Sequence, residues 1–209
     1  MIQVCDPPRQ RQVRRLSAEE FCTLVHSGGA GFYRPYAEVL RMLTAGEAWG
    51  TAGAALLVLP MTADTAAAAA LRSWLGRRQL AGGCLLTPPV GAEPSAPLVE
   101  TAAARAARLC RKGSVWAVVE CTETAAALLP LYFRQGFGLR ALRPLESLAP
   151  CFLLTTGCVP ACTAPVWVPL EDRARLALLL AKGYAALDSR PYGGTDSLAL
   201  ALYPLKEIE

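Results

Sequence analysis

Apolar residues recur at two different spacings along the chain, and the spacing predicts where helices and strands lie. Helical spacing behind a capping residue or a proline predicts helices over residues 17–26, 35–46 and 65–78. The unbroken apolar run 54–59, closed by Pro60, instead predicts a buried strand. The first part of the chain is therefore expected to mix both element types.

The second part alternates more regularly. Strand-like and helix-like segments follow one another, in order, at 83–87, 98–111, 115–121, 124–135, 139–142 and 151–156. Pro130 is expected to kink the helix over 124–135. Strands that alternate with helices of this length predict an α/β fold.

The last 45 or so residues repeat the order of parts seen over residues 115–157. Each segment has a Val-Trp strand, an apolar helix, a Gly-aromatic stop and two further strands. Gly136-Phe137 then matches Gly183-Tyr184, and Leu153 matches Leu200. We therefore predict a main domain over 1–157 and an αββ extension over 158–209, either a structural repeat or a chance similarity.

Composition narrows the class of protein. The chain of 209 residues is 53% hydrophobic and 18% charged, which excludes intrinsic disorder. A net charge of +4 does not favour a nucleic-acid partner. No segment resembles a signal peptide or a membrane span, so we expect a soluble, cytoplasmic protein. The eight Cys lie mostly in apolar runs and only one His is present, so packing roles are expected and no metal site.

One stretch carries a more specific signal. It reads VETAAARAARLCRKGSVWAVVECTETAAALLPLYFRQGF, in which a helix ending before a glycine, a strand and an LYxxxGF helix follow one another. This order resembles the central part of the GNAT superfamily, the acyl-CoA-dependent N-acyltransferases. The resemblance covers about 70 residues and implies a mixed, mostly antiparallel sheet flanked by helices, here with the extra C-terminal αββ unit.

The resemblance also implies a site. An acetyl-CoA diphosphate would lie on backbone N–H groups where the helix of residues 98–111 begins, because a helix N-terminus offers free donors and positive charge. The implied acetyl-CoA contacts are Leu86, Thr87, Val90, Gly91, Ser95, Ala96 and Leu98. Tyr132 matches the family tyrosine that protonates the departing thiolate, and Glu120 is a candidate general base acting through water.

The implied activity is transfer of an acetyl group to a small-molecule amine, with a homodimer left open. Tyr33, Arg34 and Tyr36 are candidate acceptor contacts. The stretch before Leu98 departs from the family, because Pro94 and Pro97 remove N–H donors and Glu93 adds a negative charge. The alternatives are therefore a non-catalytic GNAT-like binding or scaffold protein without the CoA site, or an unrelated α/β module.

Overall fold

The structure, a computed structural model, describes residues 12–27, 35–51, 53–66, 68, 69, 72, 83–91, 96–109, 117–143, 151–194 and 197–206. The elements of the first part are β1 (Arg14–Arg15), α1 (Ala18–Ser27), α2 (Tyr36–Ala45), β2 (Glu47–Gly50), β3 (Ala54–Pro60), β4 (Cys84–Leu86), β5 (Val90–Gly91) and α4 (Ala96–Leu109). Those of the second part are β6 (Ala117–Thr122), the 3₁₀ helix η2 (Glu123–Leu128), α5 (Leu129–Arg134), β7 (Gly138–Arg143), β8 (Cys151–Thr155), β9 (Val166–Pro169), α6 (Arg173–Ala181), β10 (Tyr184–Pro191) and β11 (Leu198–Pro204).

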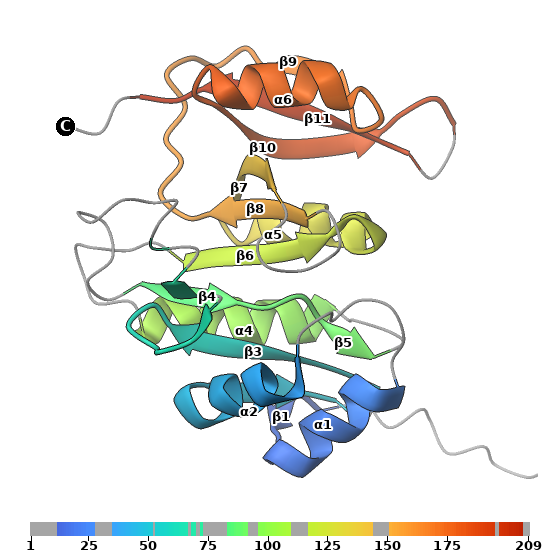
Figure 1. The fold of residues 1–209 in the computed structure, drawn as a ribbon. Helices are drawn as coiled ribbons and strands as arrows, with labels where there is room; N and C mark the ends of the chain where they lie inside the picture. The colour runs from blue at the N-terminus through green and yellow to red at the C-terminus, as the bar shows by residue number, and fades with distance from the viewer. Residues whose placement is uncertain are drawn as a thin grey trace, which may run out of the picture.

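The strands form one continuous sheet in the order β1-β2-β3-β4-β6-β8-β7-β10-β11-β9, with β5 paired to β3 (Figure 1). Neighbouring strands are antiparallel except β4 and β6, which run parallel. The predicted mixed α/β fold with a mostly antiparallel sheet is therefore confirmed. No helix within the described residues is long and apolar enough to cross a membrane.

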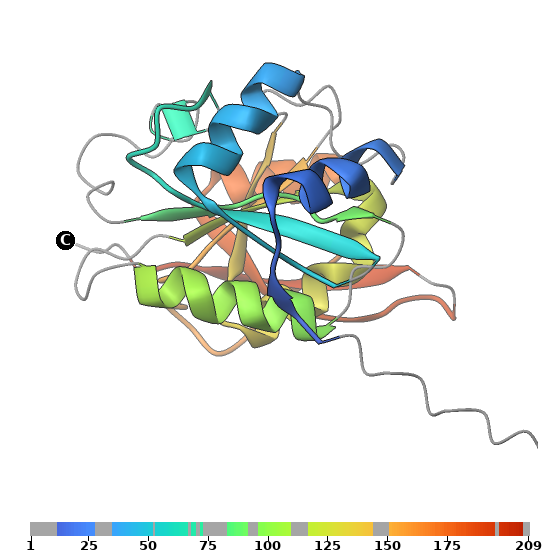
Figure 2. The same cartoon turned by 90° about the horizontal axis from the view of Figure 1, so that it is seen from below.

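Helices cover both faces of the sheet, with α1 and α2 on one side and α4 on the other (Figure 2). Two clusters of buried side chains result. The α4-side cluster includes Leu98 of α4, Tyr132 of α5 and Leu176 of α6. The α1–α2-side cluster includes Phe21 and Met42 of those helices. Alternate side chains of β3 enter opposite clusters, which explains why that strand is apolar throughout.

The helix α1 begins where the capping signal predicts. The backbone N–H of Ser17 donates to Glu20 Oε2 over 2.8 Å, and the N–H of Glu20 donates to Ser17 Oγ over 3.2 Å. The guanidinium of Arg14 also pairs with the Glu20 carboxylate. This reciprocal arrangement satisfies two N–H groups at the helix start that would otherwise lack a partner.

Two predicted helices need separate comment. The single kinked helix expected over 124–135 is wrong, because the chain forms η2 and then α5 there. Pro130 lies in the first turn of α5, where its missing N–H breaks no helical hydrogen bond. Of the helix expected over 65–78, residues 65, 66, 68, 69 and 72 are described; Thr65 lies in a bend, and the other four are helical.

The chain contains two units of the same topology. The first unit comprises β6, η2 with α5, β7 and β8, and the second comprises β9, α6, β10 and β11. Their strand orders, β6-β8-β7 and β10-β11-β9, mirror each other across the boundary between β7 and β10. Leu139 and Ala186, which occupy matching places after Gly136 and Gly183, face each other at that boundary.

The two units also share a β-bulge. The ladder between β7 and β8 shifts between Leu139 and Ala141, and the ladder between β10 and β11 shifts between Ala186 and Asp188. The extra residues are Arg140 and Leu187, which are again matching places. The predicted match of Leu153 with Leu200 is wrong by one residue, since Leu200 lies opposite Ser189 and the corresponding place belongs to Phe152, opposite Leu142.

Candidate functional site

The sheet parts between β5 and β6. Residues 84–86 of β4 lie opposite residues 117–119 of β6 in the parallel ladder. The chain then passes through Pro88 and Pro89, which lack the N–H groups needed to continue a ladder. It resumes as β5, which pairs with β3, whereas residues 120–122 of β6 pair with β8. Within the described residues, no pairing joins β5 to β6.

Two predicted site residues fasten this diverging segment to β3. The N–H of Thr87 donates to the carbonyl oxygen of Leu57 over 3.0 Å, and the N–H of Leu57 donates to Thr87 Oγ1 over 2.9 Å. Gly91 has a φ of 96°, and a Cβ there would lie 2.2 Å from the carbonyl oxygen of Gly53. Both residues therefore have a structural reason to be present, namely close approach to β3.

The helix α4 begins beside this opening. The described first turn of this helix contains no acidic residue that would counteract the positive end of its dipole. Leu98 and Val99 are fully buried in the α4-side cluster, which leaves backbone N–H groups as the polar donors of the described first turn. The predicted Ser95 lies outside the described residues.

An ion pair ties the middle of α4 to β2. Arg105 Nε and Nη2 donate to the two carboxylate oxygens of Glu47 over 2.6 and 2.7 Å, and Trp49 Nε1 donates to Glu47 Oε2 over 3.2 Å. The hydrogen bonds from Arg105 are the main reason that the pKa of Glu47 is lowered. Since Arg105 is engaged in this bidentate pair, its position on α4 anchors the helix rather than a ligand.

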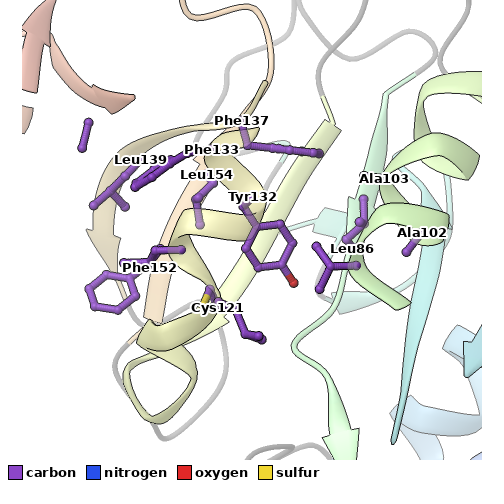
Figure 3. Close-up of a cluster of buried hydrophobic side chains, with 14 of the residues drawn as sticks. Leu86, Ala102, Ala103, Cys121, Tyr132, Phe133, Phe137, Leu139, Phe152 and Leu154 are labelled. Atoms are coloured by element: carbon purple, nitrogen blue, oxygen red, sulfur yellow. The ribbon is translucent and has the colours of Figure 1, made fainter. Parts of the chain in front are cut away.

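The side chain of Tyr132 lies beneath the opening. It has no exposed surface, and it packs edge-on against Phe137 with ring centroids 6.0 Å apart. Its hydroxyl points toward Leu86 of β4, and Cys121 of β6 lies on the same side of the ring (Figure 3). Within the described residues, the hydroxyl has no hydrogen-bond partner. An unpartnered buried hydroxyl destabilises the folded state by about 1–3 kcal/mol.

The surroundings also fix the protonation state of this phenol. Burial, and then the charge that Cys121 would carry as a thiolate, raises the pKa of Tyr132 well above its usual range. The hydroxyl therefore remains protonated at physiological pH. Chemically, it is suited to donate a hydrogen bond to a nearby anion and unsuited to act as a base.

The structure brings some predicted residues together and separates others. Leu86, Leu98 and Tyr132 meet in the α4-side cluster, whereas Val90 lies in the α1–α2-side cluster. Glu120 is paired with Leu153, whose side chain belongs to that second cluster. The ladder position of Glu120 is therefore on the face opposite Tyr132. Ala96 is half-buried in the first turn of α4.

The sequence interpretation missed Cys121 as a neighbour of Tyr132. Cys121 is fully buried at the end of β6, in the same cluster as the phenol. The two-residue alternation along residues 117–121 contains that information, because it places Cys121 on one defined face of the strand. Tyr33 and Arg34 lie outside the described residues, and Tyr36 is exposed on α2.

Among the residues that the structure describes, no three His, Cys, Asp or Glu side chains gather in a way that would hold a metal ion. Comparison with known proteins adds no further lead. No family model matches the chain, and no curated protein is significantly similar to it. The candidate site therefore rests on its own geometry.

Proposed function

We propose that this chain is a GNAT-like N-acyltransferase, which moves an acetyl group from acetyl-CoA to a small-molecule amine. The observation that carries this proposal is the unpartnered hydroxyl of Tyr132, buried beneath the place where β5 and β6 part. The strand order from β1 to β7, with its parallel pair β4 and β6, supports it because the family resemblance implies a thioester between splayed strands.

The residues present fit the sulfur end of acetyl-CoA. When bound, acetyl-CoA supplies an activated acetyl group and a thiolate leaving group. The phenol of Tyr132 holds a proton at Oη throughout the physiological pH range, and the first turn of α4 offers backbone N–H groups for phosphate oxygens.

Burial of Tyr132 favours a hydrogen bond from its hydroxyl to the sulfur of the leaving group over full transfer of its proton. In water a phenol has a pKa of about 10 and a thiol one of about 8.5, so full proton transfer is uphill by roughly 2 kcal/mol. Burial makes the phenol a still weaker acid. The same burial would disfavour a thiolate beside it, so the two effects oppose each other and a donated hydrogen bond stabilises the leaving group.

A second candidate, a GNAT-like binding or scaffold protein, is favoured by the closure of the site. Leu86, Leu98 and Tyr132 have no exposed surface, so their side chains seal the described part of the opening on the α4 side. A ligand would then reach backbone groups but not the phenol. The two candidates differ in whether acetyl-CoA binds and in whether Tyr132 acts.

Calorimetry and a rate measurement distinguish these candidates. We expect acetyl-CoA to bind the wild-type chain, and Tyr132→Phe to keep that affinity while acetyl transfer to a panel of small amines falls by about 10²-fold or more. Tyr192→Phe, at an exposed tyrosine that follows β10 and has no assigned role in the site, is the control and should change neither quantity. Absence of binding by both acetyl-CoA and CoA would overturn the transferase proposal and support the scaffold. Binding without transfer to any amine would overturn the transferase proposal and also count against a scaffold that lacks the CoA site.

A further inference from the structure

A second opening in the sheet lies at the seam, the boundary between β7 and β10. Across the seam Leu139 and Ala186 are the one pair in the ladder, although both strands are fully described. The bulges at Arg140 and Leu187 come directly after that pair and interrupt further pairing. From Arg140 onward, the β10-facing backbone groups of β7 have no strand partner among the described residues.

Helices rather than a ladder hold the two units together at the seam. The helix α5 of the first unit packs on β10 of the second, and α6 of the second unit packs on β7 of the first. Each helix thus crosses to the other unit. Beside β7, this arrangement leaves a groove beneath the end of α6.

The groove has a volume of about 420 Å³. Its walls include Arg140 and Leu142 from β7 and Ala177, Leu180, Ala181 and Gly183 from α6 and its C-terminus. This volume lies in the range of roughly 300–1,000 Å³ that is typical of small-molecule sites. Its walls offer apolar contact together with one charged side chain.

Arg140 is a half-buried cation that has no counterion within the part of the chain that the structure describes. Among the described residues its side chain makes no ion pair or hydrogen bond, and no acidic side chain lines the groove. A guanidinium presents a fork of N–H donors that matches a carboxylate. An anionic group, such as a carboxylate, can therefore bind in the groove at Arg140.

The second unit shows that this groove is a specific property of the β7 side. The matching bulge residue Leu187 is apolar and packs over Gly138, where a Cβ would lie 2.6 Å from Leu187 Cδ2. In α5 the places of Ala177, Leu180 and Ala181 are taken by the bulkier Pro130, Phe133 and Arg134. Small side chains on α6 and a charged bulge residue on β7 therefore create the groove together.

We propose that the groove binds a small apolar amino acid. Its carboxylate would pair with Arg140 and its apolar side chain would contact Leu142 and Leu180. Its ammonium would face the last turn of α6, because helix C-terminal carbonyl oxygens carry partial negative charge. That negative charge also disfavours a phosphate or another dianion. This proposal is independent of acyl transfer and concerns binding alone.

Calorimetry with the full chain tests the ligand class. The probe is leucine, compared with 4-methylpentanoate, which lacks the ammonium, and 3-methylbutylamine, which lacks the carboxylate. We expect leucine to bind, and each analogue to bind about tenfold or more weakly. No heat with leucine, or an equal affinity for the amine, would overturn the proposal.

Variants locate the site. Arg140→Gln should weaken leucine binding by about tenfold or more, whereas Arg134→Gln, at an exposed arginine of α5, should not. Ala177→Leu should fill the groove and abolish binding, whereas Ala174→Leu, at an exposed place on the same helix, should leave it intact. Equal losses in a variant and its control, with both proteins folded by circular dichroism, would contradict this location. Acetyl-CoA affinity should stay unchanged in all four variants.

Discussion

The two units have one topology and different interiors. The first unit reaches its helix through a 3₁₀ segment. Among the described residues, no side chain caps α5, and the buried hydroxyl of Tyr132 has no hydrogen-bond partner. In the second unit Asp172 caps α6 directly, and the place of Tyr132 is taken by Leu179. The second unit is thus the regular form of the motif. The first unit differs from this regular form at η2, at the start of α5 and at Tyr132. These differences lower stability, and we therefore expect a functional reason for them.

Tyr132→Phe should produce the largest effect, and in two opposite directions. Loss of the proton donor should lower acetyl transfer by about 10²-fold or more, whereas loss of a buried unpartnered hydroxyl should leave stability unchanged or raise it by about 1–3 kcal/mol. Turnover and urea unfolding measure the two effects. A clear loss of stability would show that the hydroxyl has a partner in solution, and the contrast with Leu179 would then fail.

The two glycines that end the helices test the equivalence of the units. Gly136 and Gly183 have φ values of 81° and 84°, and a Cβ at either would meet nothing within 4 Å. Replacement by Ala therefore adds backbone strain without a clash, and we expect each variant to lose about 1–2 kcal/mol of stability. Thermal unfolding of the two variants should agree. Unequal losses would show that the shared topology does not imply shared backbone energetics.

Local signals in the sequence predicted most helices and strands of the chain. Capping residues, prolines and glycines mark helix ends through groups only a few residues apart, so the bounds of α1 and α2 follow from short segments. The strand β2 gave no such signal, because Glu47-Ala-Trp-Gly50 lacks β-branched residues and is held by its neighbours. The bulges at Arg140 and Leu187 depend on pairing between distant strands, which a local pattern does not record.

The features of the candidate site also fall into two groups, those that the sequence predicted and those that depend on contacts between distant residues. The LYFRQGF motif pointed to Tyr132, and the family resemblance pointed to the start of α4. The roles of Thr87 and Gly91 depend on contacts with Leu57 and Gly53, which lie at least 30 positions away in the chain. Glu120 was assigned without knowledge of its ladder partner Leu153, and that pairing decides which face it occupies.

The cap of the second unit should have a smaller effect than the glycines. Asp172 Oδ1 accepts the N–H of Arg175 over 3.1 Å, so Asp172→Ala removes one partner of the free N–H groups at the start of α6. We expect a loss of about 1 kcal/mol in chemical unfolding. Glu171→Ala, at the adjacent exposed carboxylate, is the control and should be near neutral. Equal losses would indicate that charge near the helix start matters and that the hydrogen bond does not.

The smallest expected effect lies outside both units, in the capping box of α1. Hydrogen bonds from Arg14 and from the backbone N–H of Ser17 lower the pKa of Glu20 from 4.5 to about 2. A carboxyl with a depressed pKa in the folded state stabilises the fold above its unfolded pKa of about 4.5, and this contribution disappears as pH falls toward 2.

Glu20→Gln should therefore lower stability slightly at neutral pH and make the unfolding free energy less dependent on pH between about 4.5 and 2. Glu19→Gln, one residue earlier and without the capping contact, should leave that profile unchanged. Because Glu20 and Arg14 are both exposed, salt should reduce the difference between wild type and Glu20→Gln. A difference that salt does not reduce would mean that the hydrogen bond between Glu20 and the backbone N–H of Ser17, rather than the ion pair with Arg14, provides the stabilisation. The dependence of the unfolding free energy on pH would then reflect the cap of α1.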